Sequence, residues 1–176
     1  QKDYEPAVLE ALQQRGALIG TRKRDGHKLI VEVCANNRIR LYRSGMHEID
    51  HRLDYIREEI RTLRLSKGTL LIGELVIERI ADGKVADNVF AITSILSGSF
   101  KKAQHELAQG TLPSLFVFQA LHLQSQGLTW FSWEYSKTLR WIQKLLWEGR
   151  YVLPIDEVSG PLSAMQEQVK NNGWEG

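Results

Sequence analysis

The sequence predicts an α+β fold in which antiparallel β-sheets pack together and are flanked by helices. Two observations carry this prediction. Strand-like segments come in pairs around turn signals, as at Asn36-Asn37 and Asp82-Gly83. Between these pairs lie segments with helical spacing of apolar residues, at 52–65 and 137–147. Hairpins with helices interspersed are typical of α+β domains.

The first elements follow from local signals. Pro6 suits the start of a helix over 7–12, and Gly16 suits its C-terminal cap. A short strand is expected over 17–19. Segments 28–33 and 38–42 are expected to form a hairpin around Asn36-Asn37. The second segment alternates polar and apolar residues, as a strand does.

The rest of the chain predicts further strands and helices in alternation. An amphipathic helix covers 52–65, and a strand covers 69–78 before the Asp82-Gly83 turn. Segment 88–110 looks irregular apart from a helix at 100–109. The last expected elements are an aromatic-rich strand over 115–123, a helix over 137–147, a short strand over 151–154 and a helix after Gly160-Pro161 to about residue 169.

Composition narrows the class of protein. The 176 residues fit one domain with a sizeable core, and 43% hydrophobic with 25% charged residues is ordinary for a globular protein. No apolar run approaches the roughly 20 residues that would span a bilayer. Cys34 is the single cysteine, which excludes an internal disulfide framework and fits a reducing cytoplasm.

Charge is unevenly distributed. Residues 15–43 hold eight basic and two acidic side chains, a net charge of +6, so the rest of the +2 chain carries −4. Such a window predicts a polyanionic partner such as nucleic acid or nucleotide phosphates. The alternative is a solvated strand face that happens to be basic.

The most informative motif is Lys23-Arg24-Asp25-Gly26, which precedes the apolar run 29–31. A lysine amine, with a pKa of about 10.4, must lose its proton to attack phosphorus. Nearby positive charge or burial can lower that pKa. Arg22 and Arg24 would point away from Lys23 in an extended segment, so Lys28 or a metal ion is the better candidate. The alternative is a surface lysine in a turn.

Four further segments follow this motif in order: Tyr42-Arg43-Ser44-Gly45, Leu71-Ile72-Gly73-Glu74-Leu75-Val76, Leu115-Phe116-Val117-Phe118-Gln119 and Trp174-Glu175-Gly176. From about residue 17 onward, the series resembles the nucleotidyltransferase core of ATP-dependent DNA ligases, RNA ligases and mRNA capping enzymes, and is most similar in pattern to the DNA ligases. The resemblance implies the ligase and capping-enzyme architecture, which is ATP-grasp-like, with the nucleotide between the sheets.

The resemblance also implies roles for individual residues. Lys23 would be the nucleophile that forms lysyl-AMP, and Asp25 would order it. The expected nucleotide-binding residues are Arg22, Lys23, Gly26, Lys28, Arg43, Glu74 and Phe118. The expected nucleic-acid contacts are Arg24, Arg38, Arg40 and Arg43, and the expected Mg²⁺ ligands are Glu74 and Glu175.

Each role has a structural alternative. Asp25 could be only a turn residue, and Arg43 only an exposed arginine on a hairpin. Glu74 interrupts an apolar strand, so a buried carboxylate there must be paired or coordinating, unless that face is exposed. Phe118 could stack on a purine or share the core with Phe116.

Three residues depart from the family pattern, and one of them is Gln119, which replaces the usual acidic residue after the stacking aromatic. Lys28 stands where arginine is usual, and Thr21 stands where many ligases carry glutamate near the base, so the choice of nucleotide stays open. We expect residues 1–176 to be one nucleotidyltransferase domain that stops within the fourth motif, without the last lysine motif or an oligonucleotide-binding (OB-fold) barrel.

The predicted function is that of an ATP-dependent DNA ligase adenylation domain, with ATP and Mg²⁺ as cofactors and nicked duplex DNA as partner. We expect a monomer without membrane contact, in the cytoplasm or with the chromosome. The alternatives are an RNA ligase, a GTP-using capping guanylyltransferase, and a non-catalytic nucleic-acid-binding module on the same fold.

Overall fold

The computed structural model describes residues 5–16, 18–81, 84–108, 112–124, 127–128 and 134–174. The chain divides into two compact units. The first contains residues 1–23, 80–85 and 156–176, and the second contains 24–79 and 86–155. Strands and helices occur in both, and most strand pairs are antiparallel, so the predicted α+β class is confirmed.

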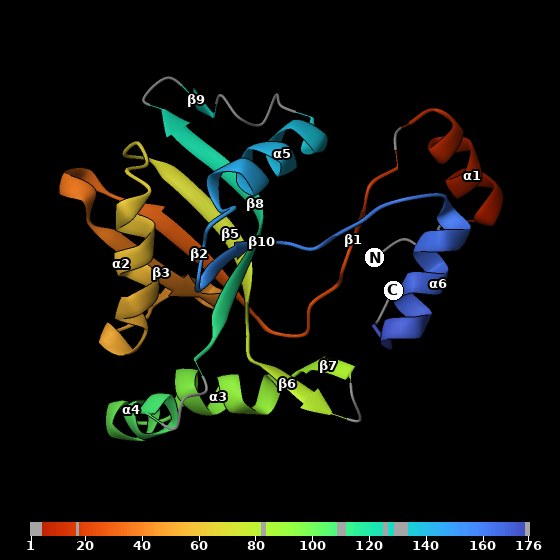
Figure 1. Cartoon of the computed structure of the whole chain (residues 1–176). Helices are drawn as coiled ribbons and strands as arrows, with labels where there is room; N and C mark the ends of the chain where they lie inside the picture. Colours follow the sequence, from red (N-terminus) through yellow and green to blue (C-terminus); the bar gives the residue numbers. More distant parts are fainter. Residues whose placement is uncertain are drawn as a thin grey trace. The chain divides into compact units, whose positions relative to one another are not determined.

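The second unit is built on a seven-stranded sheet (Figure 1). Its strand order is β10-β8-β5-β2-β3-β4, with β9 paired to the far end of β8. Neighbouring strands are antiparallel except β10, which runs parallel to β8. The strands are β2 (His27–Val33), β3 (Ile39–Arg43), β4 (His47–Glu48), β5 (Thr69–Val76), β8 (Ser114–Gln124), β9 (Gly127–Leu128) and β10 (Val152–Pro154).

One face of this sheet packs into the hydrophobic core. The register aligns Val31 with both Leu41 and Leu71, and all three side chains are fully buried. Four helices belong to this unit: α2 (Asp54–Thr62), α3 (Val89–Ser97), α4 (Phe100–Ala108) and α5 (Tyr135–Leu145). α2 and α5 lie against the sheet in Figure 1, and both bring buried isoleucines to its core. Burial of these apolar side chains is the main stabilising term.

A carboxylate on α2 fixes the chain that leads into β10. Glu59 accepts hydrogen bonds from the backbone N–H groups of Arg150 (2.7 Å), Tyr151 (2.9 Å) and Val152 (3.2 Å). Hydrogen bonds to a charged group are stronger than neutral ones. Glu59 therefore ties the helix to the sheet edge.

The first unit combines two helices with a short strand pair. β1 (Gly20–Thr21) pairs antiparallel with β11 (Glu157–Val158). α1 (Pro6–Gln14) and α6 (Leu162–Asn172) are in contact, and the Gln13 side-chain oxygen accepts the Leu162 backbone N–H at 2.9 Å. The hairpin of β6 (Glu78–Ala81) and β7 (Lys84–Asp87) begins and ends in the second unit.

Three short 3-10 turns complete the described elements: η1 (Ala35–Asn37), η2 (Ser44–Met46) and η3 (His51–Leu53). η1 closes the predicted β2–β3 hairpin. Asn36 and Asn37 both adopt positive φ there, as the turn requires and as asparagine tolerates. The predicted Asp82-Gly83 turn lies outside the described residues, but the strands on either side of it pair.

Several predicted boundaries were wrong. The strand expected at 17–19 lies at Gly20–Thr21, and the helix expected over 52–65 ends at Thr62, because Arg64 turns the chain with positive φ. The segment expected to be irregular after residue 88 contains α3. Its β-branched and aromatic residues have weak helix propensity, so tertiary burial of Ile92 and Ile95 decides its conformation.

Candidate active site

Lys23 is exposed between two buried arginines. Arg22 and Arg24 are each 7% exposed, whereas Lys23 is exposed. Such alternation is what an extended segment produces, since successive side chains point in opposite directions. It agrees with the expectation that the two arginines point away from the lysine.

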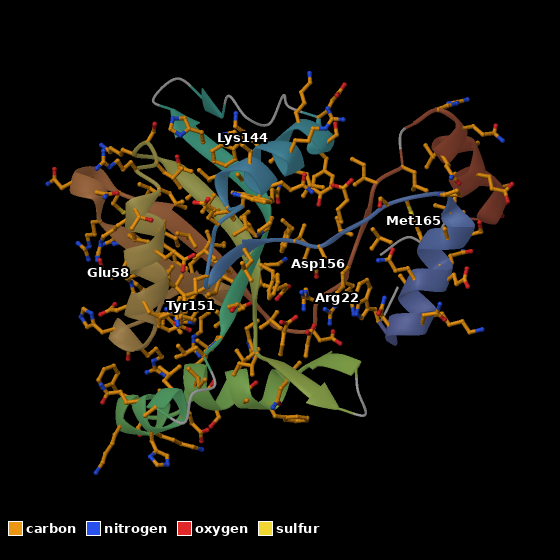
Figure 2. The ribbon with its side chains drawn as sticks, viewed as in Figure 1. Arg22, Glu58, Lys144, Tyr151, Asp156 and Met165 are labelled. Carbon is orange, nitrogen blue, oxygen red and sulfur yellow. The ribbon has the colours of Figure 1, made fainter. Side chains whose placement is uncertain are left out.

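Arg22 is held within the first unit. Its backbone N–H donates to the Asp156 carbonyl at 3.0 Å, and its guanidinium lies 3.9 Å from the Asp156 carboxylate. Figure 2 shows these two labelled side chains near each other. The guanidinium also lies 4.7 Å from the centre of the Trp174 ring, a cation–π distance. Arg22 thus anchors the backbone directly before Lys23, a role that the sequence did not indicate.

Arg24 is held within the second unit. Its Nη1 donates to Glu78 Oε1 at 2.5 Å and to Asp87 Oδ1 at 3.2 Å. Its guanidinium lies 3.7 Å from the centre of the Phe116 ring. With its side chain 3% exposed and facing two carboxylates, Arg24 does not present its charge to solvent. This burial does not favour the expected contact between Arg24 and nucleic acid.

The next two residues are held by close backbone contacts. The Asp25 N–H donates to Asp87 Oδ2 at 2.8 Å. A Cβ at Gly26 would lie only 2.3 Å from the Leu75 carbonyl oxygen, so glycine is required for β2 to approach β5 this closely. Sequence reasoning missed Asp87. The sequence did contain a signal: Asp87 is an acidic residue at the end of the predicted hairpin. It is followed by Asn88 and an apolar segment.

The sheet face opposite the core carries the predicted site residues Lys28, Glu74 and Arg40. Lys28 pairs with Glu74 across β2 and β5, and Glu74 pairs with Phe116 across β5 and β8. Lys28 is exposed and Glu74 is partly exposed. A Cβ at Gly73 would lie 2.5 Å from the Phe116 carbonyl oxygen, which explains the glycine before Glu74. We call this surface the second face.

Phe118 lies at an irregularity in β8. Val117 pairs with Gly73 and Gln119 pairs with Ile72, so Phe118 is the extra residue of a β-bulge. Bulges re-aim side chains and are common beside active sites. Val117 and Ala120 are buried on the core side, whereas Phe118 is partly exposed. The alternative that Phe118 belongs to the core is not supported.

Arg43 lies on the other side of the sheet from Lys28 and Glu74. It follows Leu41 by two residues on β3 and therefore shares the core-facing side of the strand, and its charge acts on His27, the first residue of β2. Burial, and then the Arg43 charge, lower the pKa of His27. The His27 ring is 2.8 Å from the Thr93 hydroxyl. The register therefore separates Arg43 from the residues expected to bind the nucleotide on the second face.

Arg38 and Arg40 lie near the exposed end of the hairpin. Their guanidiniums are 4.0 and 3.6 Å from Glu48 Oε1, and their side chains are 63% and 37% exposed. Arg40 also donates to the Tyr42 hydroxyl at 3.4 Å, and this hydroxyl donates to Glu32 at 2.9 Å. Burial and the bond to Glu32 raise the pKa of Tyr42. The basic character of residues 15–43 is thus partly offset by acidic partners.

Of the two expected metal ligands, Glu74 belongs to the part of the chain that the structure describes. Within it, no group of three or more His, Cys, Asp or Glu side chains could hold a metal ion, and Glu175 lies outside it. Among the described helices, none is long and apolar enough to cross a membrane.

Comparison with known proteins identifies the fold. Seventeen chains of solved structures match, among them the ligase domain of LigD from M. tuberculosis. That match has a TM-score of 0.58 at 18% identity and covers 90% of this chain and 45% of that chain, so the present chain spans less than half of it. No protein-family model matches, and no curated protein matches. The chain therefore has a fold similar to that of this ligase domain.

Proposed function

We propose that the chain is the adenylation domain of an ATP-dependent DNA ligase, with Lys23 as the nucleophile. The carrying observation is that Lys23 is an exposed residue whose preceding neighbour, Arg22, is buried and held by Asp156. A nucleophile needs this combination, because orienting it beforehand removes much of the entropic cost of reaction.

In the first step, the deprotonated Lys23 amine attacks the α-phosphorus of ATP. A nitrogen–phosphorus bond forms, the bond from that phosphorus to the bridging oxygen breaks, and pyrophosphate leaves. The protein's contribution is positioning and charge stabilisation. On the second face, Phe118 would stack on the base, Glu74 would accept a ribose hydroxyl hydrogen bond, and Lys28 would meet a phosphate.

Magnesium would bind to the protein together with the phosphates of ATP. Mg²⁺ is usually bound through one or two carboxylates together with the phosphates of the nucleotide. We therefore propose that ATP arrives as its magnesium complex. We propose that the carboxylates of Glu74 and Glu175 contact this magnesium ion.

The acceptor would be a 5′-phosphate at a nick in duplex DNA. One of its oxygens attacks the phosphorus of lysyl-AMP, the nitrogen–phosphorus bond breaks, and Lys23 is regenerated. The neighbouring 3′-hydroxyl then attacks the DNA phosphate and releases AMP. We propose Arg43, Arg38 and Arg40 as contacts to the DNA backbone, since their partly exposed guanidiniums can hold phosphates.

The proposal is tested by intact-mass spectrometry after incubation with ATP and Mg²⁺. We expect a covalent AMP adduct that Lys23→Ala abolishes. Lys67→Ala is the matched control, since Lys67 is an exposed lysine of a loop and should leave the adduct intact. An adduct that persists in Lys23→Ala, or none in the wild type, would refute the proposal.

The nucleotide and the acceptor need separate measurements. An adduct formed with GTP and not ATP would instead indicate a guanylyltransferase. Adenylated protein is then mixed with nicked DNA or nicked RNA, and 5′-adenylated strands are resolved on a denaturing gel. Transfer confined to RNA would favour an RNA ligase. Salt-sensitive DNA binding without any adduct would favour the non-catalytic module.

A further inference from the structure

We propose that Asp87 is a positioning residue for Lys23: its buried carboxylate holds the backbone that immediately follows the nucleophile. The inference rests on the proposed function and adds a residue outside the motifs that carry it. Asp87 lies 62 residues after Asp25 in the chain, yet the two are joined by a hydrogen bond.

The two oxygens of Asp87 divide their contacts. Oδ1 accepts from Arg24 Nη1 at 3.2 Å, and Oδ2 accepts from the Asp25 backbone N–H at 2.8 Å. The side chain is 6% exposed. A buried carboxylate is costly unless it is paired and hydrogen-bonded, and here one cation and one backbone donor meet it. Asp87 therefore binds both a side chain and the main chain of the lysine motif.

The position of Asp87 in the fold makes it a rigid support. It is the last residue of β7, and Glu78, the other partner of Arg24, is the first residue of β6. The base of this hairpin is closed where the Asn88 N–H donates to the Ile77 carbonyl at 2.7 Å. α3 begins directly afterwards, capped by the Asn88 side chain. Asp87 is thus held between a closed hairpin and a helix start.

Glu78 and Asp87 hold the lysine motif in different ways. Glu78 accepts a hydrogen bond from the Arg24 side chain, and its own side chain is 42% exposed. Asp87 also fixes the peptide between Arg24 and Asp25. Loss of Asp87 would leave the Arg24 charge partnered by Glu78 but would release the backbone one residue from Lys23. Arg24 stacking on Phe116 would persist.

The expected consequence is a slower chemical step without weaker nucleotide binding. A displacement of about 1 Å of a reacting group can cost about 100-fold in rate. Asp87 makes no proposed contact with ATP, so its loss should lower the rate at saturating ATP and leave half-saturation nearly unchanged. A lower rate with an unchanged half-saturation distinguishes a residue that positions Lys23 from one that binds ATP.

The test compares Asp87→Ala, Asp87→Asn and Glu78→Gln by the rate of AMP-adduct formation, normalised to the folded fraction. Asp87→Ala should be slower by about 30- to 100-fold at saturating ATP, with the ATP half-saturation within about threefold of wild type. Asp87→Asn keeps an acceptor for the Asp25 N–H and should lose only about 3- to 10-fold. Glu78→Gln should lose less than Asp87→Asn. Amide exchange at Asp25 should accelerate in Asp87→Ala only.

The outcomes separate this inference from the function on which it rests. Absence of an adduct in the wild type would refute both. A wild-type adduct with an Asp87→Ala rate equal to wild type would overturn the inference alone, as would equal losses for Glu78→Gln and Asp87→Ala. Should Asp87→Ala not fold, a wild-type rate in Asp87→Asn would overturn it.

Discussion

Gly26→Ala tests whether close strand approach, rather than backbone flexibility, requires glycine in the lysine motif. Gly26 is not among the glycines with positive φ, so alanine could adopt its backbone angles. The obstacle is space. The new Cβ would lie 2.3 Å from the Leu75 carbonyl oxygen and 3.1 Å from its carbonyl carbon, and Cβ atoms do not approach closer than 3.0 Å.

The magnitude follows from that distance. The start of β2 must move by at least 0.7 Å, the difference between 3.0 and 2.3 Å, and a backbone atom cannot rotate away as a flexible side chain could. Overpacking of this kind costs about 1–3 kcal/mol, and weakening the adjacent β2–β5 hydrogen bond adds about 1 kcal/mol. We expect Gly26→Ala to lower the free energy of unfolding by about 2–4 kcal/mol.

The assay is urea unfolding followed by circular dichroism, with midpoints and slopes compared. Gly16→Ala is the control, because Gly16 has φ of +65° and no neighbouring atom within 4 Å of the added Cβ. It should cost only the strain of a positive φ, about 1 kcal/mol. A Gly26→Ala variant within about 0.5 kcal/mol of wild type would refute the reasoning.

Two further predictions concern pH and nucleotide affinity. Burial and the Arg43 charge lower the His27 pKa below its ordinary value of 6.5, so the unfolded chain binds this proton more tightly and stability should fall as pH drops through 6.5 towards the folded pKa. Unfolding at a series of pH values should show that slope, and a slope unchanged in His27→Gln would contradict it. Phe118→Ala should raise the ATP half-saturation by about tenfold or more through lost stacking, whereas Phe118→Tyr should not, as measured by adduct formation. Equal values for the alanine and tyrosine variants would argue against stacking.

The lysine motif, the hairpin and the main strands could be predicted because their signals are local. Asn36 and Asn37 favour positive φ by themselves, and alternation along residues 38–42 places Leu41 on one side. The segment of α3 could not be predicted in the same way. Its helix depends on burial of Ile92 and Ile95 against elements distant in the chain.

The same division holds for the candidate site. Lys23, Glu74 and Phe118 were predicted from the order of the motifs, and the glycines of the first two motifs, Gly26 and Gly73, have a steric reason in the structure. The sheet face on which each side chain lies, and the ion-pair partners of the arginines, could not be predicted from the sequence. Arg43 shares a face with Leu41 because of strand register, and the carboxylates that neutralise Arg24 come from the base of a distant hairpin.

The sequence by itself was enough to predict most strands and turns and to propose the lysine motif, because those signals depend on residues within a few positions of one another. Only the tertiary structure decided that Arg24 is buried against Asp87 and Glu78, and that Asp87 holds the Asp25 backbone. A buried charge must find its partner wherever the fold brings one, and that partner is set by strand pairing over tens of residues rather than by local pattern.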